Sequence, residues 1–393
     1  MKYLLILLLS IILYAKETPF SLTVQKPFDR TLFYISKTIN QEFEIFAAAK
    51  DEKKEANKNI AYTNAFDYLA SLHTNGINLI FYRVDANAQI KESKVVNLSN
   101  STKIFSVVKV KSGYFVLTQR DEGNLMLYKL NADASVVAHQ SLDIQSNQAK
   151  LLSSSDGHIY LLTSSQPKIN SNDPFDRGYG LNDINLLKFS SEATLLWSKK
   201  YGTKYDDFAI DLTEAKDGSL VILAQSIFEG YKNVTTLRVS SSGDMIWLKQ
   251  YQNKANTTAN RIITLNDGTF LASLTQEGTK AQVKLLKFDA SNKMILDKTI
   301  QTRYASILKD IKELPSSHII GIGHVSDKED TDALVMLFDS KLNMTNQEHF
   351  GESEHDSFYT LERFDDTNII CVGTLNDKNS MWIVKLNQNS LKN

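Results

Sequence analysis

Two loops with matching acidic residues are the first candidates for chemistry. Asp206-Asp207 and His355-Asp356 follow Tyr201-Gly202 and Phe350-Gly351, and the two sets lie 149 residues apart. A carboxylate in such a loop can bind a cation or act as a general acid or base. An aspartate before a strand also caps the turn, because its oxygens accept hydrogen bonds from backbone N–H groups. Turn capping is the favoured interpretation, and a binding or catalytic role is the alternative.

A second candidate is the polar segment of residues 166–182, QPKINSNDPFDRGYGLN. Its side chains best suited to binding are Asp173, Asp176, Arg177 and Tyr179. Insertions in repeat proteins form surface loops, which often carry binding residues. The oxygen-rich side chains also suit calcium, but their spacing lacks the closing glutamate of an EF-hand. We expect either a partner-binding loop or a plain surface loop.

Other motifs for chemistry are absent from the sequence. The seven histidines include no pair at the spacing of HExxH, although His158 and His318 share a position directly after a turn. The one cysteine, Cys371, lies in an apolar run and is interpreted as a small buried hydrophobe, so an intramolecular disulfide is excluded. No nucleophile motif or glycine-rich phosphate loop is present. The sequence therefore predicts no catalytic residue, no metal site and no cofactor.

The segments that position these loops repeat about every 50 residues. An apolar–basic–apolar triplet followed by Asp, Asn or Ser recurs, for example at Leu187-Lys188-Phe189 and Leu237-Arg238-Val239. Successive triplets are 46 to 59 residues apart, and the longest step contains the insertion at 166–182. The third residues of the seven triplets are Val84, Leu130, Phe189, Val239, Phe288, Phe338 and Leu386. A unit of this length with four short apolar runs is typical of a propeller blade.

Turn chemistry supports the same division. Asp156-Gly157, Asp217-Gly218 and Asp267-Gly268 each precede a continuous apolar run, as expected for a hairpin leading into a strand covered on both faces. Tyr68-Leu69-Ala70 is expected to supply the corresponding run of the first unit. The strands of the template unit are residues 209–214, 220–224, 235–239 and 245–250.

The last unit lacks an outer strand, because the chain stops at Asn393. We expect residues 20–24 to supply that strand, since ring closure leaves only short protected edges. Residues 31–36 and 43–49 are two further candidate strands near the N-terminus. The sequence thus predicts an all-β fold: a single propeller of seven four-stranded antiparallel blades, closed by the N-terminal strand. The spare N-terminal strands leave eight blades as the alternative.

The repeat also resembles a known class. The pattern WSKKYG at residues 197–202, followed by Asp207 and Asp217-Gly218, resembles the repeats of bacterial exported β-propeller proteins. The likeness extends over roughly residues 66–387. The glycine and tryptophan of residues 243–247 more distantly resemble the repeats of quinoprotein-like propellers, a group that includes a periplasmic outer-membrane assembly scaffold. This resemblance implies a propeller and an exported location, and it transfers no site residue.

The N-terminal residues 1–15 predict a signal peptide, which leaves residues 16–393 as one propeller domain with the surface insertion at 166–182. The apolar stretch from Tyr3 to Tyr14 is shorter than the roughly 20 residues of a membrane span. Retention as an uncleaved anchor is the alternative. After cleavage we expect a periplasmic or secreted monomer without a membrane span. A net charge of -1 and a pI near 6.7 provide no basic excess for nucleic acid.

These features favour an exported, non-catalytic propeller that binds an unknown protein partner in the cell envelope as a scaffold. One alternative is a propeller enzyme (a hydrolase, lyase or quinone-dependent dehydrogenase) with its site at the tunnel mouth. That alternative requires several titratable side chains to converge from inner strands, and inner runs such as 262–264 and 308–311 do not indicate such a set. A third possibility is binding of a small ligand or sugar through aromatic residues such as Tyr179 and Tyr231.

Overall fold

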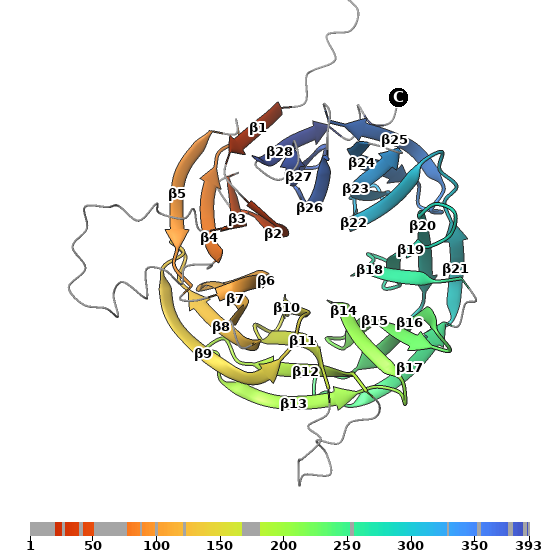
Figure 1. Cartoon of the computed structure of the whole chain (residues 1–393), viewed down its shortest axis with the longest axis horizontal. Helices are drawn as coiled ribbons and strands as arrows, with labels where there is room; N and C mark the ends of the chain where they lie inside the picture. The colour runs from red at the N-terminus through yellow and green to blue at the C-terminus, as the bar shows by residue number, and fades with distance from the viewer. Residues whose placement is uncertain are drawn as a thin grey trace, which may run out of the picture.

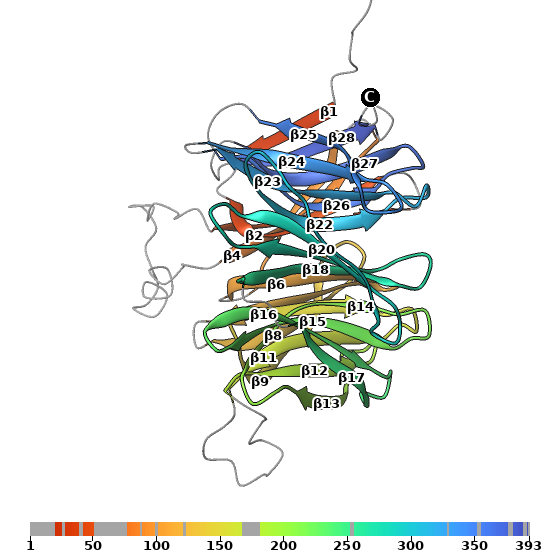
Figure 2. The same ribbon diagram turned by 90° about the vertical axis from the view of Figure 1, so that its right-hand side faces the viewer.

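Seven four-stranded antiparallel sheets stand around a central axis in the computed structural model of the chain (Figure 1). Figure 2 shows the same ring edge-on, with the turns of the blades gathered at its two faces. The seven-bladed propeller predicted from the sequence is confirmed, and the eight-bladed alternative is wrong. The structure describes residues 20–25, 28–38, 42–50, 77–86, 89–98, 101–120, 123–166, 181–251, 255–327, 330–351, 355–375, 380–387 and 391.

Each blade runs from an inner strand beside the axis to an outer strand at the rim. Blade 1 contains β2 (Phe28–Lys37), β3 (Phe43–Lys50), β4 (Ile77–Val84) and β5 (Ile90–Val96). Blade 2 contains β6 (Ser101–Val110), β7 (Gly113–Arg120), β8 (Asn124–Leu130) and β9 (Val136–Gln145). Blade 3 contains β10 (Ala149–Ser153), β11 (Ile159–Ser165), β12 (Asp183–Phe189) and β13 (Leu195–Tyr201).

The remaining four blades repeat the same order. Blade 4, the template unit of the sequence, contains β14 (Asp206–Glu214), β15 (Leu220–Phe228), β16 (Tyr231–Val239) and β17 (Met245–Tyr251). Blade 5 contains β18 (Thr257–Thr264), β19 (Phe270–Gln276), β20 (Gln282–Phe288) and β21 (Met294–Thr299). Blade 6 contains β22 (Ala305–Glu313), β23 (Ile319–Asp327), β24 (Asp330–Phe338) and β25 (Met344–Phe350). Blade 7 contains β26 (Ser357–Arg363), β27 (Asn368–Leu375), β28 (Ser380–Asn387) and β1 (Phe20–Gln25).

Ring closure follows the sequence prediction. Strand β1 is the outer strand of blade 7 and pairs antiparallel with β28, with Phe20 opposite Lys385 and Gln25 opposite Ser380. Leu22 packs against the apolar cluster between blades 7 and 1. The N-terminal strand therefore joins the end of the chain to its beginning and covers an edge that would otherwise be open.

One assignment in the first blade is wrong. Residues 68–70 lie outside the described residues, and the place given to them beside the triplet strand is taken by β3. Strand β3 pairs with β4 over its whole length, from Phe43 opposite Val84 to Lys50 opposite Ile77. The link between the second and third strands of this blade is therefore long, which breaks the regular spacing seen in the other units.

Apolar packing between blades holds the ring together. Among the described residues, each of seven buried clusters joins two neighbouring blades. Between blades 3 and 4, for example, Tyr160 and Leu162 meet Leu220 and Ile222. The second strand of each blade is buried on both sides because both of its faces meet a neighbouring sheet, which explains its continuous apolar run. Cys371 lies in such a strand, fully buried as a free thiol, as expected.

The disc has two faces with different connections. The connecting face carries the links from the outer strand of one blade to the inner strand of the next, such as residues 146–148. The hairpin face carries the Asp-Gly turns, whose glycines have positive φ (for example +77° at Gly218). The described ends of the insertion, Gln166 after β11 and Asn182 before β12, lie on the connecting face. Within the described part of the chain, no helix is long and apolar enough to cross a membrane.

Candidate binding cavity

A cavity of about 970 Å³ lies on the connecting face, between blades 2 and 3 and the first residues of blade 4. Its walls come from the link between β9 and β10, the start of β8, the end of β11 and the second half of β13. Phe208 of β14 completes the wall on the side of blade 4. Short links that end at the same face bring these segments together, although they span almost 90 residues of sequence.

Neutral polar side chains dominate the lining. The charged lining residues are Asp143 and Lys200, and the apolar ones are Ile144 and Phe208. Amide and hydroxyl groups both donate and accept hydrogen bonds, so this surface is chemically versatile but uncharged over most of its area. The amide and hydroxyl residues are Gln119, Asn124, Gln145, Ser146, Asn147, Gln148, Ser164, Ser165, Gln166, Asn182, Asn185 and Ser198.

Hydrogen bonds fix the base of the cavity. Gln119 donates from Nε2 to the carbonyl oxygen of Ser146 at 2.8 Å, which ties β7 to the link before β10. Asn185 donates from Nδ2 to Oγ of Ser165 at 2.6 Å. Ser164 accepts a hydrogen bond at 2.6 Å from the backbone N–H of Ala209 in the next blade. The base is therefore preorganised by contacts that cross from blade 2 to blade 4.

Asp206, a residue singled out in the sequence, shapes the rim of this cavity. Its Oδ1 accepts hydrogen bonds from the backbone nitrogen of Asn182 at 3.1 Å and from Nδ2 of Asn182 at 2.6 Å. Asn182 is a lining residue and the last residue of the insertion. The Asp206 carboxylate thus holds the end of the insertion against blade 4 and orients an amide at the cavity mouth.

Asp207 and Asp356 occupy matching buried positions. Asp207 accepts hydrogen bonds from the backbone nitrogen of Thr203 at 2.5 Å and from its hydroxyl at 2.8 Å, and Ser226 donates a further bond from its hydroxyl. Its side chain is fully buried, so the carboxylate caps the turn as expected. Asp356 is also fully buried, and its backbone nitrogen donates to the carbonyl oxygen of Thr331.

The other candidate residues from the sequence do not line the cavity or lie outside the described residues. His355 is exposed in the link between blades 6 and 7 and does not line the cavity. Asp173, Asp176, Arg177 and Tyr179 lie outside the described residues. The loop that carries them starts and ends at the cavity, because Gln166 and Asn182 both belong to its lining.

The histidines that share a turn position form local contacts on the hairpin face. Nδ1 of His158 lies 2.8 Å from Oδ2 of Asp156, and Nδ1 of His318 lies 3.1 Å from the carbonyl oxygen of Ser316. Neither residue lines the cavity. Among the residues that the structure describes, no group of three or more His, Cys, Asp or Glu side chains is arranged to hold a metal ion.

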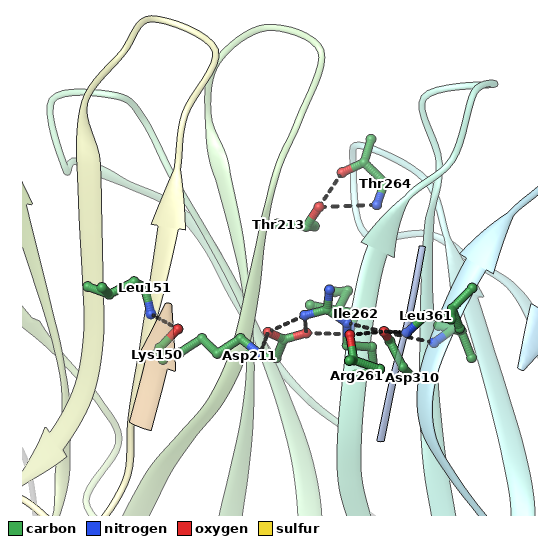
Figure 3. A network of polar contacts seen from close by, with 12 residues as sticks. Lys150, Leu151, Asp211, Thr213, Arg261, Ile262, Thr264, Asp310 and Leu361 are labelled. Atoms are coloured by element: carbon green, nitrogen blue, oxygen red, sulfur yellow. Dashed lines mark hydrogen bonds and ion pairs between the residues drawn. The ribbon is translucent and has the colours of Figure 1, made fainter. Parts of the chain in front are cut away.

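The inner strands bring charged residues together around the axis, contrary to the expectation from sequence (Figure 3). Arg261 of β18 donates to both carboxylate oxygens of Asp211 in β14 at 2.8 and 2.9 Å, and to Oδ1 of Asp310 in β22 at 2.9 Å. Lys150 of β10 lies 3.8 Å from Oδ1 of Asp211. Four neighbouring blades thus contribute alternating charges at one level of the tunnel.

These charges also bond to the backbone of the next blade. Oδ2 of Asp211 accepts from the nitrogen of Ile262 at 2.9 Å, and Oδ2 of Asp310 accepts from the nitrogen of Leu361 at 3.2 Å (Figure 3). Burial alone would lower the pKa of Arg261, but the two aspartates outweigh it and raise that pKa. The carboxylates are committed to linking blades, so this network is structural rather than an open catalytic set.

The cavity was not predicted from the sequence. Its walls are mostly amides and serines from strands and links of blades 2 and 3, and such residues are ordinary near any solvated turn. The run QSNQ at residues 145–148 between two strands is the one local signal, and it carries no motif. The site forms because several strands and links converge in space, and no spacing along the chain marks it.

Comparisons with known proteins give the fold class. No protein-family model and no curated protein matches this chain. Solved structures do match: an ulvan lyase of polysaccharide lyase family PL25, described bound to -[GlcA(1-4)Rha3S]-, has a TM-score of 0.62 at 9% identity and covers 94% of this chain and 98% of its own. Puromycin hydrolase has a TM-score of 0.56 at 11% identity, with 94% of this chain and 55% of that chain covered.

The Dos1 propeller gives a TM-score of 0.51 at 9% identity and covers 92% of this chain and 94% of its own. At identities this low the likeness concerns the fold alone. The chain is a β-propeller, and propellers carry unrelated functions on one architecture. Function must therefore be argued from the cavity itself.

Proposed function

We propose that this chain is an exported, non-catalytic binding propeller of the cell envelope, and that its binding site is the cavity on the connecting face. The cavity is the observation that carries the proposal. It is large, concave and prepared by cross-blade hydrogen bonds, and it adjoins the insertion that interrupts the repeat. Ligand sites are concave, largely preformed and few per protein.

The exported location rests on the N-terminal sequence and on the likeness of the repeats to bacterial exported propellers. Residues 1–15 have the basic start, apolar stretch and small final residue of a signal peptide. If the bound partner is a protein, this binding function is the scaffold role that the sequence led us to expect. N-terminal sequencing of the protein from the periplasm is expected to start at Lys16.

The lining supports binding without catalysis. Acid–base or nucleophilic chemistry needs a titratable group paired with a second group that activates it. Asp143 and Lys200 are the charged side chains among the lining residues, and they stand in a surface of neutral amides and hydroxyls. The polysaccharide lyase and the hydrolase similar in fold show that propellers can carry enzymes, but a fold transfers no activity.

Site-specific photo-crosslinking in living cells tests the proposal. A photoreactive amino acid is placed at exposed Gln148 in the cavity, and a matched one at exposed Ser291 in a turn of the hairpin face. We expect an adduct of higher mass from position 148 and none from position 291, whether the partner is a protein or a glycan. Adducts from both positions alike, or none from position 148, would contradict the proposed site.

A further inference from the structure

The chemistry of the cavity wall excludes several ligand classes. Ligands with large apolar surfaces need a mostly apolar lining, and among the described lining residues only Ile144 and Phe208 supply one. Phosphates and carboxylates are recognised by clustered arginines and lysines, whereas Lys200 is the single basic residue in the described part of the lining. Hard cations need several carboxylates, whereas the walls that the structure describes contain one, from Asp143. What remains is a neutral polar ligand.

Amides and hydroxyls match a ligand that both donates and accepts hydrogen bonds at many points. Eight of the lining side chains are amides and four are serines. Each sugar hydroxyl is itself a donor and an acceptor, so such a wall can satisfy it in either role. The side chains of Gln145, at the end of β9, and of Asn147 and Gln148, on the short link to β10, are exposed to solvent and accessible to a ligand.

The placement of Phe208 adds an apolar contact of the kind that a sugar ring requires. Phe208 is half-buried in the cavity wall, while its neighbour Ala209 is 2% exposed and belongs to the core between blades 3 and 4. In blade 7 the register counterpart of Ala209 is Phe358, which is fully buried. Because adjacent strand residues point to opposite faces, the phenylalanine of blade 4 is turned out of the core.

The dimensions agree with an extended ligand. About 970 Å³ is at the upper end of the range of roughly 300–1,000 Å³ typical of ligand pockets. The cavity reaches from β8 of blade 2 to β14 of blade 4 and is bounded by the described ends of the insertion, Gln166 and Asn182. A chain of sugar units can contact both the fixed amides at the base and the apolar face of Phe208.

We propose that the cavity binds a neutral oligosaccharide, an inference that rests on the proposed function and names its ligand class. Amide side chains of the β9–β10 link form hydrogen bonds with the hydroxyl groups of the sugar, and the ring of Phe208 packs against the C–H face of one sugar ring. Asn182, held by two hydrogen bonds to Asp206, closes the site beside the insertion. The described part of the wall contains one basic side chain, Lys200, rather than the cluster of cations that an acidic glycan would require.

The test uses the exported protein purified from the periplasm. A glycan array that contains neutral and acidic oligosaccharides is probed first, and the best neutral glycan is titrated by calorimetry. We expect Gln148→Ala and Phe208→Ala each to weaken binding by about tenfold, while Gln89→Ala leaves it unchanged. Gln89 is an exposed glutamine in the β4–β5 turn of blade 1, on the hairpin face opposite the cavity, and serves as the matched control. Equal melting temperatures show that the variants are folded.

Three outcomes would overturn the ligand class: no glycan bound, a preference for acidic glycans, or binding that the two cavity variants leave intact. A protein adduct from position 148 without any glycan binding rejects the saccharide but sustains the proposed binding function. Absence of any adduct and any glycan binding rejects both. Cleavage of the bound glycan keeps the ligand class and contradicts the non-catalytic role.

Discussion

Arg238 of β16 donates a hydrogen bond from Nη2 to Oδ2 of Asp217 in the Asp-Gly turn, at 2.8 Å. The basic residue of the triplet and the aspartate of the turn, two separate repeats in the sequence, are therefore the two ends of one ion pair. The guanidinium also lies over the ring of Phe270, with 5.9 Å to the centroid. The same pair recurs as Lys188 with Asp156 at 3.3 Å and Lys287 with Asp267 at 3.0 Å.

Replacing Arg238 tests this contact. Its guanidinium also donates to Oγ of Ser219 at 2.8 Å and to the carbonyl oxygen of Ala290 in blade 5 at 2.6 Å. Arg238→Met keeps the aliphatic stem but removes these hydrogen bonds and the ion pair with Asp217, so we expect a loss of about 1–3 kcal/mol in the free energy of unfolding. Urea unfolding followed by tryptophan fluorescence measures it. Lys341→Met, at an exposed turn residue, is the control, with a change within about 0.5 kcal/mol.

The tunnel network predicts a larger effect. Arg261→Met removes the cation that joins the buried carboxylates of Asp211 and Asp310, which are 1% and 9% exposed, and leaves Asp211 paired with the more distant Lys150. Breaking a buried ion pair in this way costs about 3–5 kcal/mol. A double-mutant cycle with Asp211→Asn is expected to show strong coupling, because the second change removes one of the two carboxylates that Arg261 neutralised. Additive effects of the two substitutions on unfolding in urea would exclude the interaction.

His324 predicts a pH-dependent component of stability. Burial, assisted by Lys309, lowers its pKa from 6.5 to about 4. Between these values the unfolded chain binds a proton that the folded chain rejects, so stability falls as the pH drops through this window. Gln225 holds the same register position in blade 4 and bonds to Ala259 and Thr257 of the next blade.

The variant His324→Gln therefore keeps an uncharged polar group at that position. We expect the difference in unfolding midpoint between pH 7 and pH 5 to be smaller in this variant than in the parent chain. Melting curves at the two pH values measure this difference. The carboxylates are the same in both proteins, so their contribution to the pH dependence cancels when the two are compared. An equal pH dependence in both proteins would show that His324 is accessible to protons.

The sequence predicted the fold correctly wherever the blades repeat the same turn and the same ion pair. The Asp217-Gly218 turn needs a glycine with positive φ, and the Arg238 triplet needs a cation beside that turn, so both leave a regular trace in the sequence. Blade 1 was misassigned because its second strand, β3, precedes the triplet strand by a long connection, residues 51–76, which an even spacing rule does not allow.

The candidate site and the tunnel network escaped sequence reasoning for a different reason. Asp211, Arg261 and Asp310 lie in three successive inner strands, about 50 residues from one another, and become neighbours only when adjacent blades pack. Likewise, Gln148 and Phe208 belong to different blades and carry no motif. A site that takes single residues from several repeats cannot be detected from the sequence of any one repeat. Asp206 was identified from its matching loop, although its role is to hold Asn182.

The glycine of the aromatic–glycine pair is expected to be indispensable for packing. A Cβ atom at Gly202 would lie 2.5 Å from Oδ1 of Asp183 and 3.4 Å from Oδ2 of Asp207. Gly202→Ala must therefore displace buried carboxylates, at a cost of about 1–3 kcal/mol in unfolding free energy. Gly278→Ala is the control, since its nearest neighbour would be 3.7 Å away. Equal stability of the two variants would mean that the turn at Gly202 can shift to accommodate the added methyl group at little cost in free energy.

Closure of the ring by β1 gives the last prediction. Val24 packs against the cluster between blades 7 and 1, whereas its neighbour Thr23 is exposed in the same strand. Asp has a low strand propensity at either position, so the two variants differ mainly in the face that receives the charge. We expect Val24→Asp to cost about 1–3 kcal/mol and Thr23→Asp about 0.5 kcal/mol or less. Urea unfolding measures both, and limited proteolysis is expected to cut Val24→Asp faster near the N-terminus. If the two variants prove equally stable, β1 contributes little to holding the ring closed.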